Sequence, residues 1–192
     1  QTGPVLITHW GLSGPAVLRL SAWGARLLQE KEYRFTIQLN WLEGEGWNAA
    51  SVLSYFEQHR QEHPSQQLTN SRMFQLPQRL WDYFLTESGI APPIRFAELK
   101  KKDENKLIKL LTDMTMEING KTTFKEEFVT AGGVDCTEID AMAMQSKLVP
   151  DLYFAGEIMD VDGITGGFNF QHAWSSGYLA ALSIATKKDQ FN

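Results

Sequence analysis

Residues 152–171, LYFAGEIMDVDGITGGFNFQ, combine a short apolar run, an acidic and glycine-rich loop, and the start of a helix. We expect a strand over residues 151–155 and a helix over residues 170–186, joined by the loop. The adjacent glycines Gly166 and Gly167 allow a flat ligand to approach the backbone closely. The free N–H groups that open the helix carry a partial positive charge. This stretch therefore predicts a binding site for a dinucleotide cofactor.

The chemistry of a flavin suits this loop. Its N1 atom and C2 carbonyl gain negative charge on reduction, so a helix N-terminus aimed at them favours the reduced form. Glu157, directly after the strand, is placed to accept hydrogen bonds from the ribityl hydroxyls. The alternative ligand is Ca²⁺, because Glu157, Asp160 and Asp162 offer hard oxygen ligands. Their spacing does not fit the twelve-residue loop of an EF-hand, and we expect no metal site.

The N-terminal part of the chain predicts a strand, a helix and a second strand. Residues 5–8 form an apolar strand that leads into a glycine turn, and residues 16–23 show helical spacing behind Pro15. Residues 33–40 alternate apolar and polar side chains, as a strand with one buried face does.

The middle of the chain changes to helical periodicity. Apolar residues from Val52 to Phe56 follow Asn48, a residue suited to a helix N-cap, and further helices are expected over residues 78–86 and 105–114. Strand character returns at residues 115–118. There the pair Asn119-Gly120 predicts a type I′ turn into a strand over residues 122–128. The chain therefore predicts an α+β fold in which helices interrupt a β structure.

Composition and charge exclude several classes of protein. The 192 residues are 43% hydrophobic and 21% charged, which is typical of a folded domain, and the net charge is −5. This negative charge argues against nucleic-acid and anionic-membrane partners. The only basic cluster is Lys100, Lys101 and Lys102, and the acidic residues after it indicate a solvated start to a helix. The single cysteine, Cys136, and the lack of a membrane span or signal pattern indicate a cytoplasmic protein.

Several motifs together resemble a known family. They are THWGLSGP at residues 8–15, VTAGGV at 129–134, MQSK at 144–147, YFAGE at 153–157, DVDG at 160–163, TGGFN at 165–169 and AWSSG at 173–177. This pattern is similar to the C-terminal signature of the bacterial YhiN/BaiN-type flavoproteins, which are FAD-dependent NAD(P) oxidoreductases. The resemblance lies at both ends of the chain and brackets the helical middle, so it covers essentially the whole sequence.

The resemblance implies a domain organisation. It predicts a partial β-barrel-like domain over residues 1–46 and 115–149, an all-helical HI0933-like insert over residues 47–114, and the C-terminal strand, loop and helix of a two-part FAD-binding domain over residues 150–192. The family's N-terminal Gly-x-Gly-x-x-Gly turn, which holds the ADP half of FAD, is not in this sequence. We therefore expect a domain fragment that holds no FAD by itself and is inactive alone.

The resemblance also implies roles for particular residues. Gly156 and Glu157 would meet the ribityl chain of FAD, while the residues bordering its isoalloxazine ring would be Gly166, Gly167, Phe168, Asn169 and Gln171. Asp160 and Thr165, in the same loop, complete the candidate cofactor-binding set. In the complete protein, FAD would carry hydride between NAD(P)H and an unidentified small organic substrate.

The sequence does not identify the catalytic residues. His9 is a candidate proton donor to the substrate, although a histidine at a strand exit could instead pack with one nitrogen satisfied. His172, the other candidate, would by its family position face either the flavin edge or the barrel. A non-enzymatic interaction or oligomerisation module is the alternative function. The C-terminal strand and helix carry apolar faces, so we also expect a homo-oligomer formed through this segment.

Overall fold

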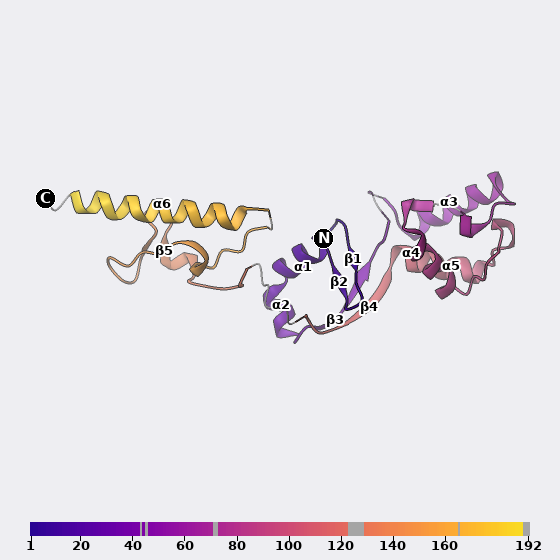
Figure 1. Ribbon diagram of the computed structural model, residues 1–192, viewed down its shortest axis with the longest axis horizontal. Helices are drawn as coiled ribbons and strands as arrows, with labels where there is room; N and C mark the ends of the chain where they lie inside the picture. The colour runs from indigo at the N-terminus through magenta and orange to yellow at the C-terminus, as the bar shows by residue number, and fades with distance from the viewer. Residues whose placement is uncertain (43, 45, 71–72, 123–128, 165, 190–192) are drawn as a thin grey trace. The chain divides into compact units, whose positions relative to one another are not determined.

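The computed structural model describes residues 1–192 apart from 43, 45, 71–72, 123–128, 165 and 190–192 (Figure 1). It divides into two compact units, one made of Gln1–Tyr33 with Gly120–Asn192 and the other of Arg34–Asn119. The sheets of the described residues are two-stranded and none closes into a barrel, and together with the helices they give an α+β fold. The expected division into four domain segments stays a prediction.

The unit Arg34–Asn119 is built on one antiparallel pair of strands. β3 (Arg34–Leu39) pairs with β4 (Met114–Asn119), and the register runs from Arg34 opposite Asn119 to Leu39 opposite Met114. Exposure alternates along both strands, as expected for a sheet with one covered face. The strands expected near residues 33–40 and 115–118 are thus confirmed.

Helices fill the chain between these two strands (Figure 1). In order they are α3 (Ala49–Glu62), η1 (Leu68–Asn70), η2 (Met73–Gln75), α4 (Gln78–Glu87), η3 (Phe96–Glu98) and α5 (Lys101–Thr112). Asn48 caps α3, because its Oδ1 accepts the N–H groups of Ala50 and Ser51 at 3.0 Å each. The core of this unit includes the fully buried side chains of Phe56, Trp81, Phe84, Phe96, Leu107 and Leu111.

The limits of α5 differ from the expected range of residues 105–114. The helix begins at Lys101, so that Glu104 and Leu107 already belong to its buried face. It ends at Thr112, because Met114 pairs with Leu39 as the first residue of β4. Local periodicity identified the helix, but long-range packing and pairing decide where it starts and stops.

The expected type I′ turn at Asn119-Gly120 is wrong. Asn119 is the last residue of β4 and lies opposite Arg34 in the ladder, so its backbone is extended. A strand partner far along the chain has overridden the local turn preference. Most of the strand expected over residues 122–128 lies outside the described residues.

The other unit begins with a small hairpin of β1 (Leu6–Ile7) and β2 (Leu12–Ser13). It continues with α1 (Pro15–Trp23) and α2 (Ala25–Glu30), and Pro15 opens α1 as its sequence position predicted. The C-terminal part contains η4 (Cys136–Glu138), β5 (Ile139–Asp140) paired with β6 (Gln145–Ser146), η5 (Gly156–Ile158) and α6 (Phe168–Asp189). Its small core is made of Ile139, Met144, Met159 and Ala180.

The strand expected over residues 151–155 is not formed. Within the described chain this segment makes one isolated bridge, between Tyr153 and Gln145, and its Phe154 N–H donates to the Met144 carbonyl at 2.9 Å. A short apolar run becomes a strand only when a neighbouring strand supplies a ladder of hydrogen bonds, and here β6 supplies little more than one rung. The expected C-terminal helix is confirmed, but it begins earlier, at Phe168.

The helix α6 leaves large apolar side chains exposed. They are Phe168, Phe170, Trp174, Tyr178, Leu182 and Ile184. Phe170 and Trp174 stack on each other with ring centroids 6.1 Å apart. Despite this apolar surface, none of the helices that the structure describes has the length and hydropathy needed to cross a membrane.

Candidate functional site

The glycine-rich loop before α6 is anchored just ahead of its start, at Gly156 of η5, by a buried serine. The Gly156 N–H donates to Ser176 Oγ at 2.9 Å, and Ser176, on α6, is only 2% exposed. Ser176 Oγ in turn donates to the His172 carbonyl at 2.7 Å. Because its N–H is bonded to Ser176 in the third turn of α6, Gly156 has a fixed position relative to that helix.

The same loop is anchored again at its other end. Asn169, in the first turn of α6, accepts the Gly163 N–H on Oδ1 at 2.7 Å and donates from Nδ2 to the Gly163 carbonyl at 3.3 Å. A Cβ atom at Gly163 would lie 2.7 Å from Asn169 Oδ1, so the paired amide requires glycine there. Asn169 was expected to border the flavin ring. In this structure its amide holds the loop.

Between Gly163 and Asn169, the glycines Gly166 and Gly167 present bare backbone. Their φ angles are 131° and 99°, and apart from the adjacent residues, a Cβ atom added at either would have no heavy atom of the described residues within 4 Å. The two glycines directly precede α6, and the Gln171 N–H of its first turn donates to the Gly167 carbonyl at 2.9 Å. Open space beside a helix N-terminus leaves room for a flat ring, and the positive end of the helix favours negative charge on it. Thr165, which precedes them, lies outside the described residues.

A second segment packs under η5. The Val134 N–H donates to the Ile158 carbonyl at 2.8 Å, and the Asp160 N–H donates to the Val134 carbonyl at 3.0 Å. Glu157 is exposed, and its Oε1 accepts the Thr130 N–H at 3.2 Å. The VTAGGV motif at residues 129–134 therefore supports the YFAGE motif directly. Within the described residues, the second carboxylate oxygen of Glu157 has no hydrogen bond, and a carboxylate oxygen can accept one from a hydroxyl.

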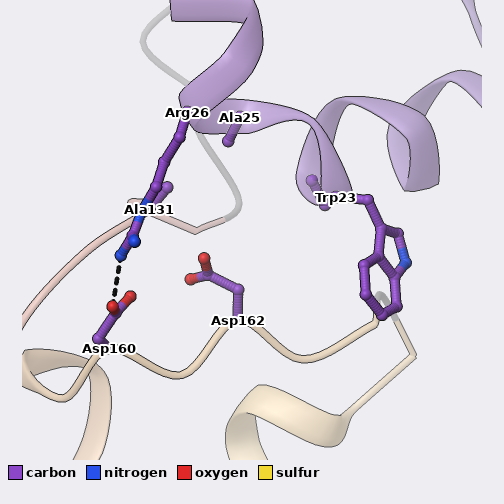
Figure 2. Close-up of a pocket in the computed structure, with 7 residues that line it drawn as sticks. Trp23, Ala25, Arg26, Ala131, Asp160 and Asp162 are labelled. Carbon is purple, nitrogen blue, oxygen red and sulfur yellow. Dashed lines mark hydrogen bonds and ion pairs between the residues drawn. The ribbon is translucent and has the colours of Figure 1, made fainter. Parts of the chain in front are cut away.

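Asp160 lies in a hollow beside α2. Figure 2 shows its carboxylate paired with the guanidinium of Arg26, with Asp162 next to the pair. The hollow has a volume of about 250 Å³, and Trp23 and Ala131 also line it. The hydrogen bond from Arg26 to Asp160, followed by their charge attraction, raises the pKa of Arg26. No sequence signal pointed to Arg26, because its partner is distant in the chain and lies in a different motif.

The two candidate histidines lie in different surroundings. His9 is exposed in the turn between β1 and β2, and among the described residues no hydrogen bond or ring contact joins it to the glycine loop. His172 lies on α6, half buried, and its Nε2 atom is buried with no hydrogen-bond partner in the described part of the chain. The side chain of Gln171, which precedes it, donates to Ser175 Oγ at 3.0 Å.

The residues gathered around the loop fit a flavin better than a metal ion. The open glycine pair offers a flat surface, Glu157 offers an acceptor, and Ser176 and Asn169 hold the backbone in place. A metal would instead require convergent acidic, histidine or cysteine side chains. Across the residues that the structure describes, no three such side chains are grouped closely enough to hold a metal ion.

One family model and several known proteins are similar to this chain. The family described as HI0933-like protein barrel and H2TH domain matches residues 1–129. Two proteins named ribosomal RNA dihydrouridine synthase are similar, one from Escherichia coli K12 (37% identity over 96% of this chain) and one from Haemophilus influenzae (35% over 94%). A 3-dehydro-bile acid delta(4,6)-reductase from Clostridium scindens is 31% identical over 97% of the chain. The chain spans 43%, 42% and 45% of these relatives, respectively.

Proposed function

This chain belongs to the HI0933-like flavoprotein family, and from that premise we propose that it forms part of an FAD-dependent reductase that saturates a uridine of ribosomal RNA. The observation that carries the proposal is the similarity to two proteins named ribosomal RNA dihydrouridine synthase, which extends over nearly the whole chain. Both are more similar to this chain than the bile acid reductase is.

The names of these relatives describe one class of reaction. Dihydrouridine is uridine with its ring carbon–carbon double bond saturated, and a delta(4,6)-reductase acts, by its name, on carbon–carbon double bonds. Saturation of a carbon–carbon double bond adds two hydrogens, which are formally a hydride and a proton. When bound, FAD supplies the hydride, which it receives from NAD(P)H.

The residues of this chain would position the cofactor. Gly166 and Gly167 leave room for a ring against the start of α6, whose positive end stabilises negative charge that develops there. Glu157 would accept a hydrogen bond from the ribityl chain through the oxygen that Thr130 leaves free. Ser176 and Asn169 would hold the loop, so that little motion is needed on binding.

The added proton needs a donor, and His172 is the better candidate. Its Nε2 is buried, has no hydrogen-bond partner among the described residues, and lies on the helix that begins after the glycine loop, whereas His9 is exposed on a hairpin. Buried polar atoms normally have a partner, so an orphaned nitrogen favours a group that the substrate or cofactor completes. If His172 is the donor, His172→Gln should lower turnover while leaving the flavin content unchanged.

An RNA substrate departs from the expectation, drawn from the net charge of −5, of no nucleic-acid partner. Net charge is an average over the chain, and basic side chains collected on one surface still attract phosphate. The second candidate is a reductase of a small organic molecule, which the similarity to the bile acid reductase favours.

The decisive experiment compares the two substrates with the complete protein. Purified enzyme is incubated with NADPH or NADH and either ribosomal RNA lacking dihydrouridine or a small conjugated enone. Mass spectrometry of digested RNA then detects a uridine that has gained two hydrogens. Turnover of the enone without any change in the RNA would replace the first candidate with the second.

A further inference from the structure

The helix α5 displays a group of exposed lysines. Lys100, Lys101, Lys102, Lys106 and Lys109 all lie on its surface or directly before it. Lys101 has acidic partners, since its Nζ lies 3.0 Å from Glu104 Oε2 and 3.7 Å from Glu57 Oε1. Lys102, Lys106 and Lys109 form no ion pair or hydrogen bond within the described part of the chain. They are therefore free to bind an external anion.

These three lysines share one face of the helix. They are spaced by four and three residues, the spacing of neighbours along a helix surface. At 1.5 Å per residue, the row is roughly 10 Å long. We call Lys102, Lys106 and Lys109 the lysine row.

The opposite face of α5 fixes the direction of the lysine row. Glu104, Leu107, Ile108 and Leu111 are buried in the helical core, so α5 cannot rotate about its axis without exposing them. At 100° per residue, the lysine row lies on the side of the helix away from these residues. The three charges therefore face solvent on a rigid support.

Helix stability does not account for the lysine row. Like charges four residues apart disfavour a helix, and Lys102 lies near the N-terminus, where the helix dipole is unfavourable for a cation. Only Lys109, in the last turn, is favourably placed with respect to the dipole. Because the lysine row does not stabilise the helix, it is a candidate surface for binding a partner.

We propose that the lysine row contacts the phosphate backbone of the RNA substrate. This inference rests on the proposed function. Lysine ammonium groups are compact point charges that bind phosphate without reading the base, and they would supply affinity and leave selection of the uridine to the reductase site. A local row also reconciles an RNA substrate with an acidic chain, because short-range contacts with phosphate are little affected by charges beyond the Debye length.

The test measures RNA affinity of the complete protein at several salt concentrations. The variant is Lys102→Gln/Lys106→Gln/Lys109→Gln, and the matched control is Lys31→Gln/Lys121→Gln/Lys147→Gln, which removes three exposed lysines from the other unit. We expect the slope of log affinity against log salt to become shallower by about two to three in the variant, and the Kd to rise roughly tenfold or more. Flavin content and RNA-independent oxidation of NAD(P)H should not change.

The outcomes separate this inference from the proposed function. If the unmodified enzyme reduces uridine but the variant keeps its RNA affinity and salt slope, the lysine row is not a contact surface and the proposed function stands. Equal weakening in the variant and the control would also overturn the inference, because general charge would then explain both. If the unmodified enzyme neither binds nor reduces RNA, the proposed function fails, and the inference fails with it.

Discussion

Gly133 is the residue at which a side chain is least acceptable. Its φ angle is 154°, and a Cβ atom would lie 2.5 Å from the Ile158 carbonyl oxygen and 2.8 Å from the Asp160 nitrogen. Gly133→Ala should therefore separate residues 129–134 from η5 and destabilise the chain by about 1–3 kcal/mol in denaturant unfolding. Gly132→Ala is the control, since Gly132 has a φ of 103° but no atom within 4 Å of its Cβ position. Equal losses of stability in the two variants would mean that backbone strain, and not the close contact with residues 158–160, explains the effect.

Glu157 is the residue whose charge the cofactor proposal uses most directly. In the complete protein, Glu157→Gln keeps the shape but replaces a charged acceptor with a neutral one, so the Kd for FAD should rise about tenfold. Flavin content after gel filtration, followed by titration of the apoprotein, measures this. Glu138→Gln, on the exposed η4, is the matched control. Full flavin retention in Glu157→Gln would remove Glu157 from the binding site.

The pKa of the Asp135 carboxyl group should lie below its usual value. Its carboxylate accepts hydrogen bonds from the Thr137 N–H at 2.8 Å and the Thr137 hydroxyl at 2.7 Å, and these lower its pKa. Because the folded pKa is below the unfolded one, this stabilisation is present above the unfolded pKa and lost as pH falls through the folded pKa. Thr137→Val should raise the pKa of Asp135 partway, since the backbone bond remains. A carboxyl NMR titration checks this, with Thr186→Val as control, and an unchanged pKa would contradict it.

At the scale of elements, α3 and α5 are joined by a buried ion pair. Glu104, on α5, is 0% exposed, and it accepts a hydrogen bond from Arg60 of α3 at 2.5 Å. Its other oxygen lies 3.0 Å from Lys101 Nζ but makes no directed hydrogen bond. In Arg60→Ala, Lys101 is the one cation of the described residues left beside this buried carboxylate. The substitution should lower the free energy of unfolding by about 3–5 kcal/mol. Arg79→Ala, at an exposed position on α4, should change stability by less than about 0.5 kcal/mol.

The elements that the sequence predicted well are those whose pattern is local. Alternation identified β3, and the Asn48 cap with the following apolar spacing identified α3. The failures involve long-range partners. Residues 151–155 look like a strand but have one bridge, and Asn119 looks like a turn residue but pairs with Arg34. A pattern in one segment does not reveal which other segment completes its hydrogen bonds.

In the candidate site too, the sequence revealed the local features but not the long-range contacts. The glycine loop and its flanking helix were visible in the sequence, because glycine pairs and helix starts are local features. The sequence did not reveal the ion pair of Arg26 with Asp160 or the hydrogen bond from Gly156 to Ser176. Each of these interactions joins segments that are far apart in the chain. Asn169 was identified as important, but its bond to the Gly163 backbone appears only in three dimensions.

At the scale of the whole molecule, the exposed apolar side chains of α6 predict self-association of this chain. Trp174 is 69% exposed, and Phe170, Tyr178 and Leu182 add to the same helix surface. Burying each against a second copy would contribute roughly 1.5–3 kcal/mol. Sedimentation velocity should therefore show concentration-dependent association, and Trp174→Lys/Leu182→Lys should shift the chain towards monomer. Tyr83→Lys, on α4 of the other unit, is the control. A monomer at all concentrations would contradict the prediction.

The ladder between β3 and β4 has a consequence for how such a chain could have evolved. Because Arg34 and Asn119 are register partners, the polypeptide enters and leaves the unit Arg34–Asn119 at adjacent points. An ancestral gene could therefore have gained or lost the intervening helices, or exchanged them for others, without rerouting the chain on either side.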